Sequence, residues 1–177
     1  MKTDGSDRVD AMKLAQSGQT LKGECEGAWL ARWAASAPAP DLAGPVGWTA
    51  TFELQTDASG HAVAWMDLDA HAETQLECQR CLSPMNWTQS VHRRFRFVAT
   101  ETEALAEDND SEEDVLALDQ ELDLRVLVED ELIMDLPLVP MHEQCPNPVH
   151  LSAQTPDFVE KPPAFSALAQ LKIDKKD

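Results

Sequence analysis

Two neighbouring stretches of the chain alternate between apolar and polar residues at every second position. From 64 to 78 the even positions are mostly apolar and the odd positions mostly charged or polar, and from 85 to 97 the odd positions carry the apolar residues. Period-two alternation is typical of a strand with one buried face. Since the short segment Cys-Gln-Arg-Cys-Leu-Ser-Pro joins the two stretches, we predict an antiparallel hairpin over residues 64–98.

A register for this hairpin follows from matching apolar faces and opposite charges. Pairing Cys78 with Met85 aligns both apolar faces and sets Asp67 opposite Arg96. Opposite charges across a strand pair stabilise it by a few tenths of a kcal/mol, up to about 1 kcal/mol. This register turns Arg93 inward, where we expect a bulge or a strand edge to accommodate it.

Weaker patterns place the remaining elements. Residues 21–33 and 48–55 read as strands, residues 101–118 as an acidic loop, and residues 123–136 as a helix that an aspartate caps and Pro137 ends. Apolar residues on more than one side of this helix predict packing on two sides, and its three successive acids, 129–131, read as a solvated edge.

Together these elements predict an α+β fold. We expect an antiparallel β-rich domain with a central hairpin, one main helix packed on the sheet, an acidic loop and a short C-terminal helix or tail. The expected organisation is a flexible N-terminus over 1–18, a single α+β domain over 19–160, and a tail over 161–177.

Charge narrows the classes of partner. The 177 residues carry a formal net charge of −18, and between 101 and 135 the only base is Arg125. Such a surface repels nucleic acid and suits a basic partner, although residues 101–114 alone read as a disordered loop that keeps the protein soluble. No stretch approaches the roughly 20 apolar residues of a membrane span, so we expect a cytoplasmic protein.

Candidate chemistry lies in two short pairs, Cys78-Gln-Arg-Cys81 and His142-Glu-Gln-Cys145. Each pair leaves two residues between its potential ligands, a spacing that lets one turn aim two side chains at one ion. Three thiolates and one imidazole form a tetrahedral zinc shell with no position left for water. The sequence therefore predicts a structural zinc site that joins the middle of the chain to its last third.

Two other interpretations of the cysteines stay open. The thiols can be unmetallated residues of the core or surface, as we expect for Cys25, which lies far from both pairs. A redox pair is the other alternative, and it requires the first cysteine at a helix N-terminus after a strand.

Two further segments are candidate binding residues. Arg93, Arg94 and Arg96 alternate with phenylalanines and are a candidate RNA contact, with ordinary pairing to cross-strand acids as the competing interpretation. Phe165, Leu168 and Leu171 in the tail are a candidate helix for docking on a partner protein, or they pack on the sheet of their own domain.

Several of these segments, in the same order, resemble the bacterial YceD proteins. The resemblance rests on Leu-Glu-Cys-Gln-Arg-Cys-Leu at 76–82, on the block from 124 to His142, on Cys145, and on the tail from Pro163 to Lys172. That family is associated with accumulation of the large-subunit ribosomal RNA. The resemblance implies a non-enzymatic role in ribosome biogenesis. The charge then favours a large-subunit precursor or ribosomal proteins as partners, with local contact to the RNA through the arginines.

The alternative class is an enzyme, either a metal-dependent RNA-processing enzyme or a thiol oxidoreductase that uses the Cys pair. A nuclease needs converging carboxylates around an open metal site. The sequence contains no such cluster, no phosphate-binding glycine loop and no nucleophile elbow.

Overall fold

The computed structural model describes residues 8–57, 60–108, 111–118 and 121–147. The chain divides into two units between Asn147 and Pro148, and the second unit lies outside the described residues. The predicted domain boundary at residue 160 and the predicted tail over 161–177 therefore also lie outside the described part of the chain.

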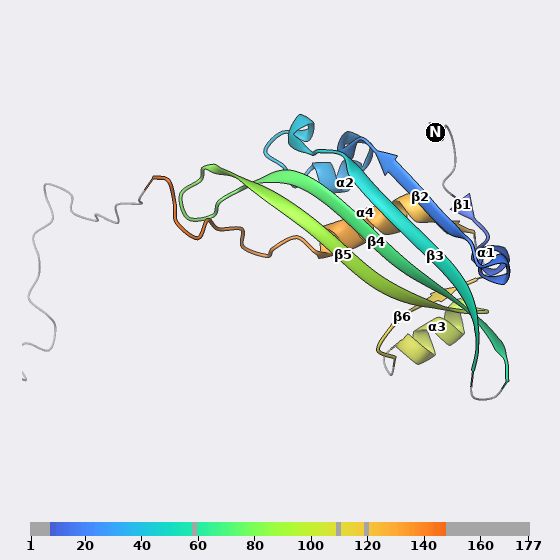
Figure 1. Cartoon of the computed structure of the whole chain (residues 1–177). Helices are drawn as coiled ribbons and strands as arrows, with labels where there is room; N and C mark the ends of the chain where they lie inside the picture. The colour runs from blue at the N-terminus through green and yellow to red at the C-terminus, as the bar shows by residue number, and fades with distance from the viewer. Residues whose placement is uncertain (1–7, 58–59, 109–110, 119–120, 148–177) are drawn as a thin grey trace, which may run out of the picture. The chain divides into compact units, whose positions relative to one another are not determined.

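A five-stranded sheet of order β2-β3-β4-β5-β6 organises the first unit (Figure 1). Its strands are β2 (Thr20–Cys25), β3 (Val46–Thr56), β4 (Ala62–Glu77), β5 (Pro84–Val98) and β6 (Asp114–Ala117). β2 to β5 are antiparallel, and β6 runs parallel to β5. A separate two-stranded pair joins β1 (Arg8–Val9) to β7 (Leu122–Asp123). The α+β class, the central hairpin and the strand over 48–55 are confirmed.

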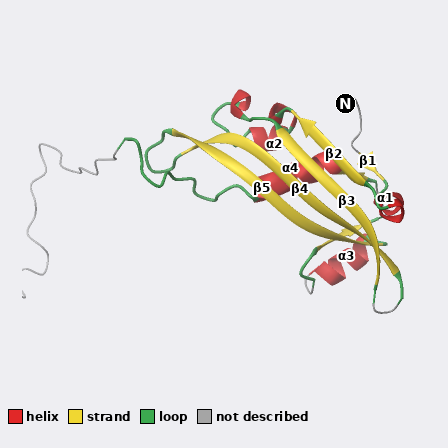
Figure 2. Cartoon of the chain, viewed as in Figure 1, coloured by secondary structure: helices red, strands yellow, loops and turns green. Residues whose placement is uncertain are grey.

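Helices cover one face of this sheet (Figure 2). They are α1 (Ala11–Ser17), α2 (Ala31–Ala34) and α4 (Leu124–Met134), with 3-10 turns at Gly27–Trp29 and Pro40–Leu42. The even-numbered residues of β4 from 64 to 76 face them and are buried, as the alternation predicts, and those from 64 to 72 share a core with Trp33, Phe52, Phe95 and Leu132. No helix among the described residues has the length and apolar character needed to cross a membrane.

The hairpin register differs from the prediction by two residues. Asp67 lies opposite Arg94 rather than Arg96. A slip of two residues leaves every side chain on its predicted face, so the apolar pattern cannot distinguish the two registers. The turn distinguishes them, because Cys78 leaves the strand and its amide donates to the Ser83 carbonyl at 3.0 Å.

Arg93 faces the helices as predicted, but it requires no bulge, since the pairing of β4 with β5 continues past it. Its guanidinium Nε donates to Glu131 Oε2 at 3.0 Å. The inward arginine is therefore accommodated by a carboxylate on α4.

The N-terminal region holds more regular structure than the pattern predicts. A flexible segment over 1–18 does not hold from Arg8 onward, because Asp10 caps α1 and Gly18, at φ 59°, ends it. The helix buries only Ala11 and Ala15, too small a stripe to stand out in the sequence. The strand predicted over 21–33 is correct only for β2, and helical turns follow it.

The predicted acidic loop over 101–118 is also wrong. It contains α3 (Glu101–Glu107), which Thr100 caps through the amide of Glu103, and then β6. Two apolar side chains, Ala104 and Val115, are buried there. The acids point outward around this small buried surface, so the charge run conceals two ordered elements.

Helix α4 begins and ends close to its prediction, with Asp123 as its N-cap. Packing on two sides is wrong in part, because Val126 is 46% and Met134 is 69% exposed. The solvated edge is wrong as well, since Glu129 and Glu131 are buried. Each of these two carboxylates binds an arginine of another element, Glu129 with Arg32 of α2 and Glu131 with Arg93 of β5.

Candidate metal centre and its surroundings

The turn between β4 and β5, residues 78–83, brings Cys78 and Cys81 together; we call it the knuckle. Its backbone closes on itself where the amide of Leu82 donates to the Cys78 carbonyl at 2.8 Å. Leu82 has φ 56°, and it is the only non-glycine residue of the described chain with a positive φ. This left-handed residue reverses the chain directly after the second ligand.

A return loop, residues 137–147, brings the second pair to the knuckle. In Figure 1 this loop, drawn in orange, runs from the end of α4 to the turn between β4 and β5. The amide of Gln79 donates to the Pro140 carbonyl at 2.8 Å, and the amide of His142 donates to Cys78 Sγ at 3.4 Å. The loop is therefore fixed against the knuckle at its centre.

These contacts gather all four predicted ligands. One side-chain atom each from Cys78, Cys81, His142 and Cys145 lies within 4.8 Å of the other three. Sulfurs around a tetrahedral zinc, at about 2.3 Å from the metal, lie about 3.8 Å apart. The cluster is thus within about 1 Å of a closed zinc shell, and it could bind a metal such as zinc.

The electrostatics of the cluster favour a cation. Burial opposes ionisation of the Cys78 thiol, but the backbone amides of His142, Cys81 and Arg80 lower its pKa to about 5. The hydrogen bond to Cys78 raises the pKa of His142. Against the effect of burial, hydrogen bonds lower the pKa of Cys81 as well, whereas burial raises that of Cys145. Negative charge on Cys78 and Cys81 therefore attracts a positive charge to the cluster, and a divalent metal supplies it when the imidazole is neutral.

The geometry bears on the alternative interpretations of the cysteines. The Cys78–Cys81 pair sits at a hairpin tip between two strands, not at the N-terminus of a helix, which a redox pair requires. Cys25 lies at the end of β2, half-buried, and is not part of the cluster.

The three arginines of the candidate RNA contact do not share one face. Arg93 faces the helices, while Arg94 and Arg96 lie on the open face of the sheet. Each forms an ion pair: Arg93 with Glu131, Arg94 with Glu53 at 2.8 Å, and Arg96 with Glu107 at 2.7 Å. Their charge is largely neutralised by neighbouring carboxylates.

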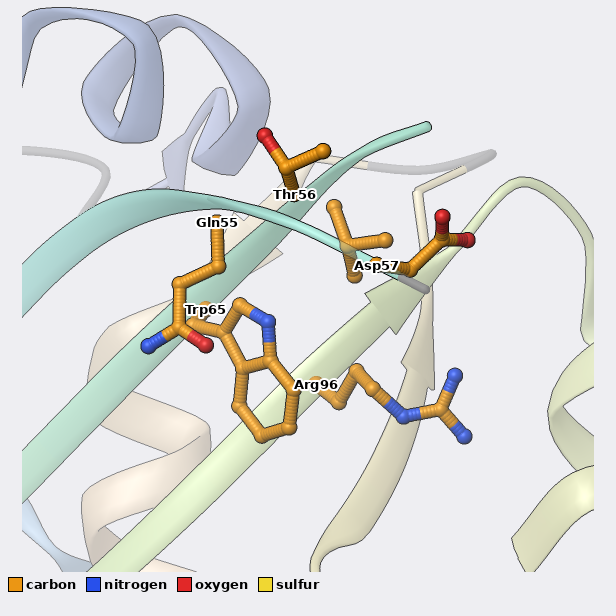
Figure 3. A pocket seen from close by; sticks show the side chains of 6 residues that line it. Gln55, Thr56, Asp57, Trp65 and Arg96 are labelled. Carbon is orange, nitrogen blue, oxygen red and sulfur yellow. The ribbon is translucent and has the colours of Figure 1, made fainter. Parts of the chain in front are cut away.

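The sequence reasoning missed one feature of the open face, the indole of Trp65. The Arg94 guanidinium lies 4.7 Å from the centroid of its ring. A hollow of about 120 Å³ adjoins it (Figure 3), lined by Gln55, Thr56, Asp57, Val63, Trp65 and Arg96. Figure 3 shows the guanidinium of Arg96 directed away from the indole. The available signal was the position of Trp65, which lies two residues before Asp67 and therefore on the same outward face as the alternating acids.

The remaining candidates, Phe165, Leu168 and Leu171, lie outside the described residues.

The protein is therefore a mixed α+β protein with a candidate structural metal site. The site is a Cys3His cluster that lies at the tip of the long hairpin and is closed by the loop after the main helix. The chain belongs to the YceD family, since residues 66–172 match the family model described as "Large ribosomal RNA subunit accumulation protein YceD". A Haemophilus influenzae protein of the same name is 36% identical over 111 residues, 56% of this chain and 60% of the relative's length. No solved structure matched the chain.

Proposed function

We propose that this protein is a non-enzymatic ribosome biogenesis factor that supports accumulation of the large-subunit (23S) ribosomal RNA. The observation that carries the proposal is the extent of the family match, which spans most of the hairpin, α4, the return loop and all four candidate ligands. The name of both the family and the relative refers to this accumulation.

The candidate metal is zinc in a structural role. Cys78, Cys81, His142 and Cys145 provide the donor set of a closed Cys3His site, which leaves no coordination position for water or substrate. When bound, zinc supplies a link between the knuckle and the return loop. The chain's own residues then do the rest: backbone amides hold Cys78 ionised, and the loop excludes solvent from its sulfur, which is fully buried.

Two observations support the absence of catalysis. A hydrolytic metal site keeps one position open, and the four donors leave none. The adjacent acids of α4 do not converge either, because Glu129 and Asp130 bind Arg32 while Glu131 binds Arg93.

Partners of this factor are large-subunit ribosomal proteins or the precursor particle in the cytoplasm. The net charge of −18 repels phosphates, with screening over about 8–10 Å at physiological salt. Contact with ribosomal RNA through Arg94 and Arg96 is a secondary interaction, since RNA must compete with Glu53 and Glu107. Phe165, Leu168 and Leu171 are proposed as a docking motif for the partner protein.

Depletion and complementation in the source bacterium test this function. We expect depletion to lower the ratio of 23S to 16S ribosomal RNA, and a plasmid copy of the wild-type chain or of Cys25→Ser to restore it. Cys78→Ser should restore it poorly, because the knuckle loses its link to the return loop. An unchanged ratio in cells shown to lack the protein contradicts the proposed function.

A further inference from the structure

Exposed apolar side chains gather at the end of the protein that holds the candidate metal centre. Of nine large apolar residues that are exposed in the described chain, four belong to the knuckle or the return loop. They are Leu82, Leu138, Val139 and Met141. Leu138 is 101% exposed and Leu82 is 68% exposed. Single exposed apolar residues are ordinary, but a cluster of them marks an interaction surface.

The contacts of the metal centre hold this cluster in one place. Pro140 accepts a hydrogen bond from Gln79, and the sulfur of Met141 lies 3.7 Å from a guanidinium nitrogen of Arg80. The return loop from 138 to 141 therefore lies beside the knuckle. We call the surface formed by Leu82, Leu138, Val139 and Met141 the knuckle patch.

Leu82 shows that part of this surface is held under strain. A left-handed conformation costs a residue with a Cβ about 1–2 kcal/mol relative to the right-handed one, and glycine or asparagine is the usual occupant. Here a leucine adopts φ 56° and places its side chain mainly in solvent. Burial within the described chain does not offset this strain, and strained residues of this kind cluster at binding sites.

We propose that the knuckle patch is the docking surface for a basic protein of the large-subunit precursor, one whose apolar side chains are flanked by lysine or arginine. Charge complementarity selects this partner. Along 77–83 and 137–147, the segments that carry the patch and its rim, the exposed acids are Glu77 and Glu143 and the exposed base is Arg80. The chain as a whole has a net charge of −18. A basic protein gains from this rim, whereas RNA phosphates are repelled by it.

The metal ligands set the geometry of the patch. Leu82 directly follows Cys81, and Met141 directly precedes His142. A metal bound by these ligands fixes both apolar side chains relative to each other before the partner arrives. Such preorganisation lowers the entropic cost of association, so docking should depend on the metal as well as on the apolar side chains.

The inference rests on the proposed function, and a matched set of variants tests it separately. The docking variant is Leu82→Asn with Leu138→Asn, because asparagine tolerates the left-handed conformation and removes the apolar side chain. The control is Leu105→Asn on α3, since Leu105 is 67% exposed and lies beyond the opposite end of β5. Far-UV circular dichroism and metal content confirm that each full-length variant is folded.

The probes are individually purified proteins of the bacterial large ribosomal subunit, measured one at a time by biolayer interferometry at physiological salt. We expect at least one basic protein to bind the wild type and Leu105→Asn with the same Kd. The docking variant should bind that protein about tenfold more weakly or worse, and so should wild-type protein stripped of metal.

Three results overturn the inference: no protein of the set binds, the docking variant binds as tightly as the control, or naked ribosomal RNA competes fully with the bound protein. Complementation with the same variants separates this inference from the proposed function. If wild type and docking variant restore the 23S to 16S ratio equally, the proposed function stands and the knuckle patch is not its docking surface. If neither wild type nor variant affects the ratio, both fail.

Discussion

Replacing Glu129 by alanine is the sharpest test of how the structure holds α2 against α4. Glu129 is 8% exposed and its carboxylate accepts four hydrogen bonds. The donors are the amide of Arg32 at 2.7 Å, its Nε at 3.0 Å, its Nη2 at 2.9 Å, and the amide of Trp33 at 3.3 Å. The substitution leaves these donors without their acceptor.

The expected loss can be built from these contacts. A buried amide without an acceptor, as Trp33 would have, costs about 1–3 kcal/mol. The ion pair contributes less, about 0–1 kcal/mol, because the side chain of Arg32 is 54% exposed and water screens it. With a smaller share from the partly exposed amide of Arg32, Glu129→Ala should lower the free energy of unfolding by about 2–4 kcal/mol.

Asp130→Ala is the matched control. Asp130 lies next in the chain and binds the same guanidinium at 2.6 Å, but its side chain is 43% exposed. We expect a loss below about 1 kcal/mol. Urea unfolding at pH 7, followed by tryptophan fluorescence, measures both variants. Equal losses would show that the buried hydrogen bonds of Glu129 do not hold α2 in place.

Three further predictions concern pH, packing and metal. Burial raises the pKa of Glu129, but hydrogen bonds from Arg32 and Trp33 outweigh it and keep the value below the ordinary 4.5. The stabilisation that ionised Glu129 contributes is therefore full above pH 4.5 and is lost as pH falls through the folded pKa. The free energies of unfolding of wild type and Glu129→Gln should differ at pH 7 and converge in acid. A difference that persists in acid contradicts this. Gly27→Ala should lower the free energy of unfolding by about 1–3 kcal/mol, because the new Cβ would clash with the Gly44 carbonyl oxygen. Gly47→Ala should cost less, since only the exposed His71 ring must move. Thermal unfolding of both variants ranks their losses of stability, and the reverse order would count against this account of the packing. Cys78→Ser and chelation should each remove the metal and lower Tm, while Cys25→Ser should retain about one equivalent by elemental analysis; a Cys78→Ser protein with unchanged metal content would remove Cys78 from the site.

Local pattern was enough to find the central hairpin and the four members of the candidate metal cluster. Alternation reports which face is buried, and two-residue spacing reports which side chains one turn can aim at an ion. The register was beyond reach, because a slip of two residues satisfies the same alternation. What decided it was the tightness of the knuckle, where the amide of Cys78 donates to the Ser83 carbonyl and so continues the observed pairing of Glu77 with Pro84.

Local pattern also could not predict which charged side chains are buried in ion pairs. Glu129 and Glu131 read as solvent-facing because their partners, Arg32 and Arg93, lie far away in the chain. The acidic run from 101 to 118 hid α3 and β6 for a related reason. Its small buried surface, centred on Ala104 and Val115, is outnumbered by acids in any local average.

X-ray absorption at the zinc K-edge, on protein purified without chelator, tests the closed metal site most directly. A site formed by Cys78, Cys81, His142 and Cys145 predicts three sulfur ligands at about 2.3 Å and one nitrogen ligand at about 2.0–2.1 Å, with about one zinc per chain. Less than about a tenth of an equivalent of zinc, or an oxygen ligand in place of one of the four, would contradict a structural zinc link between the knuckle and the return loop.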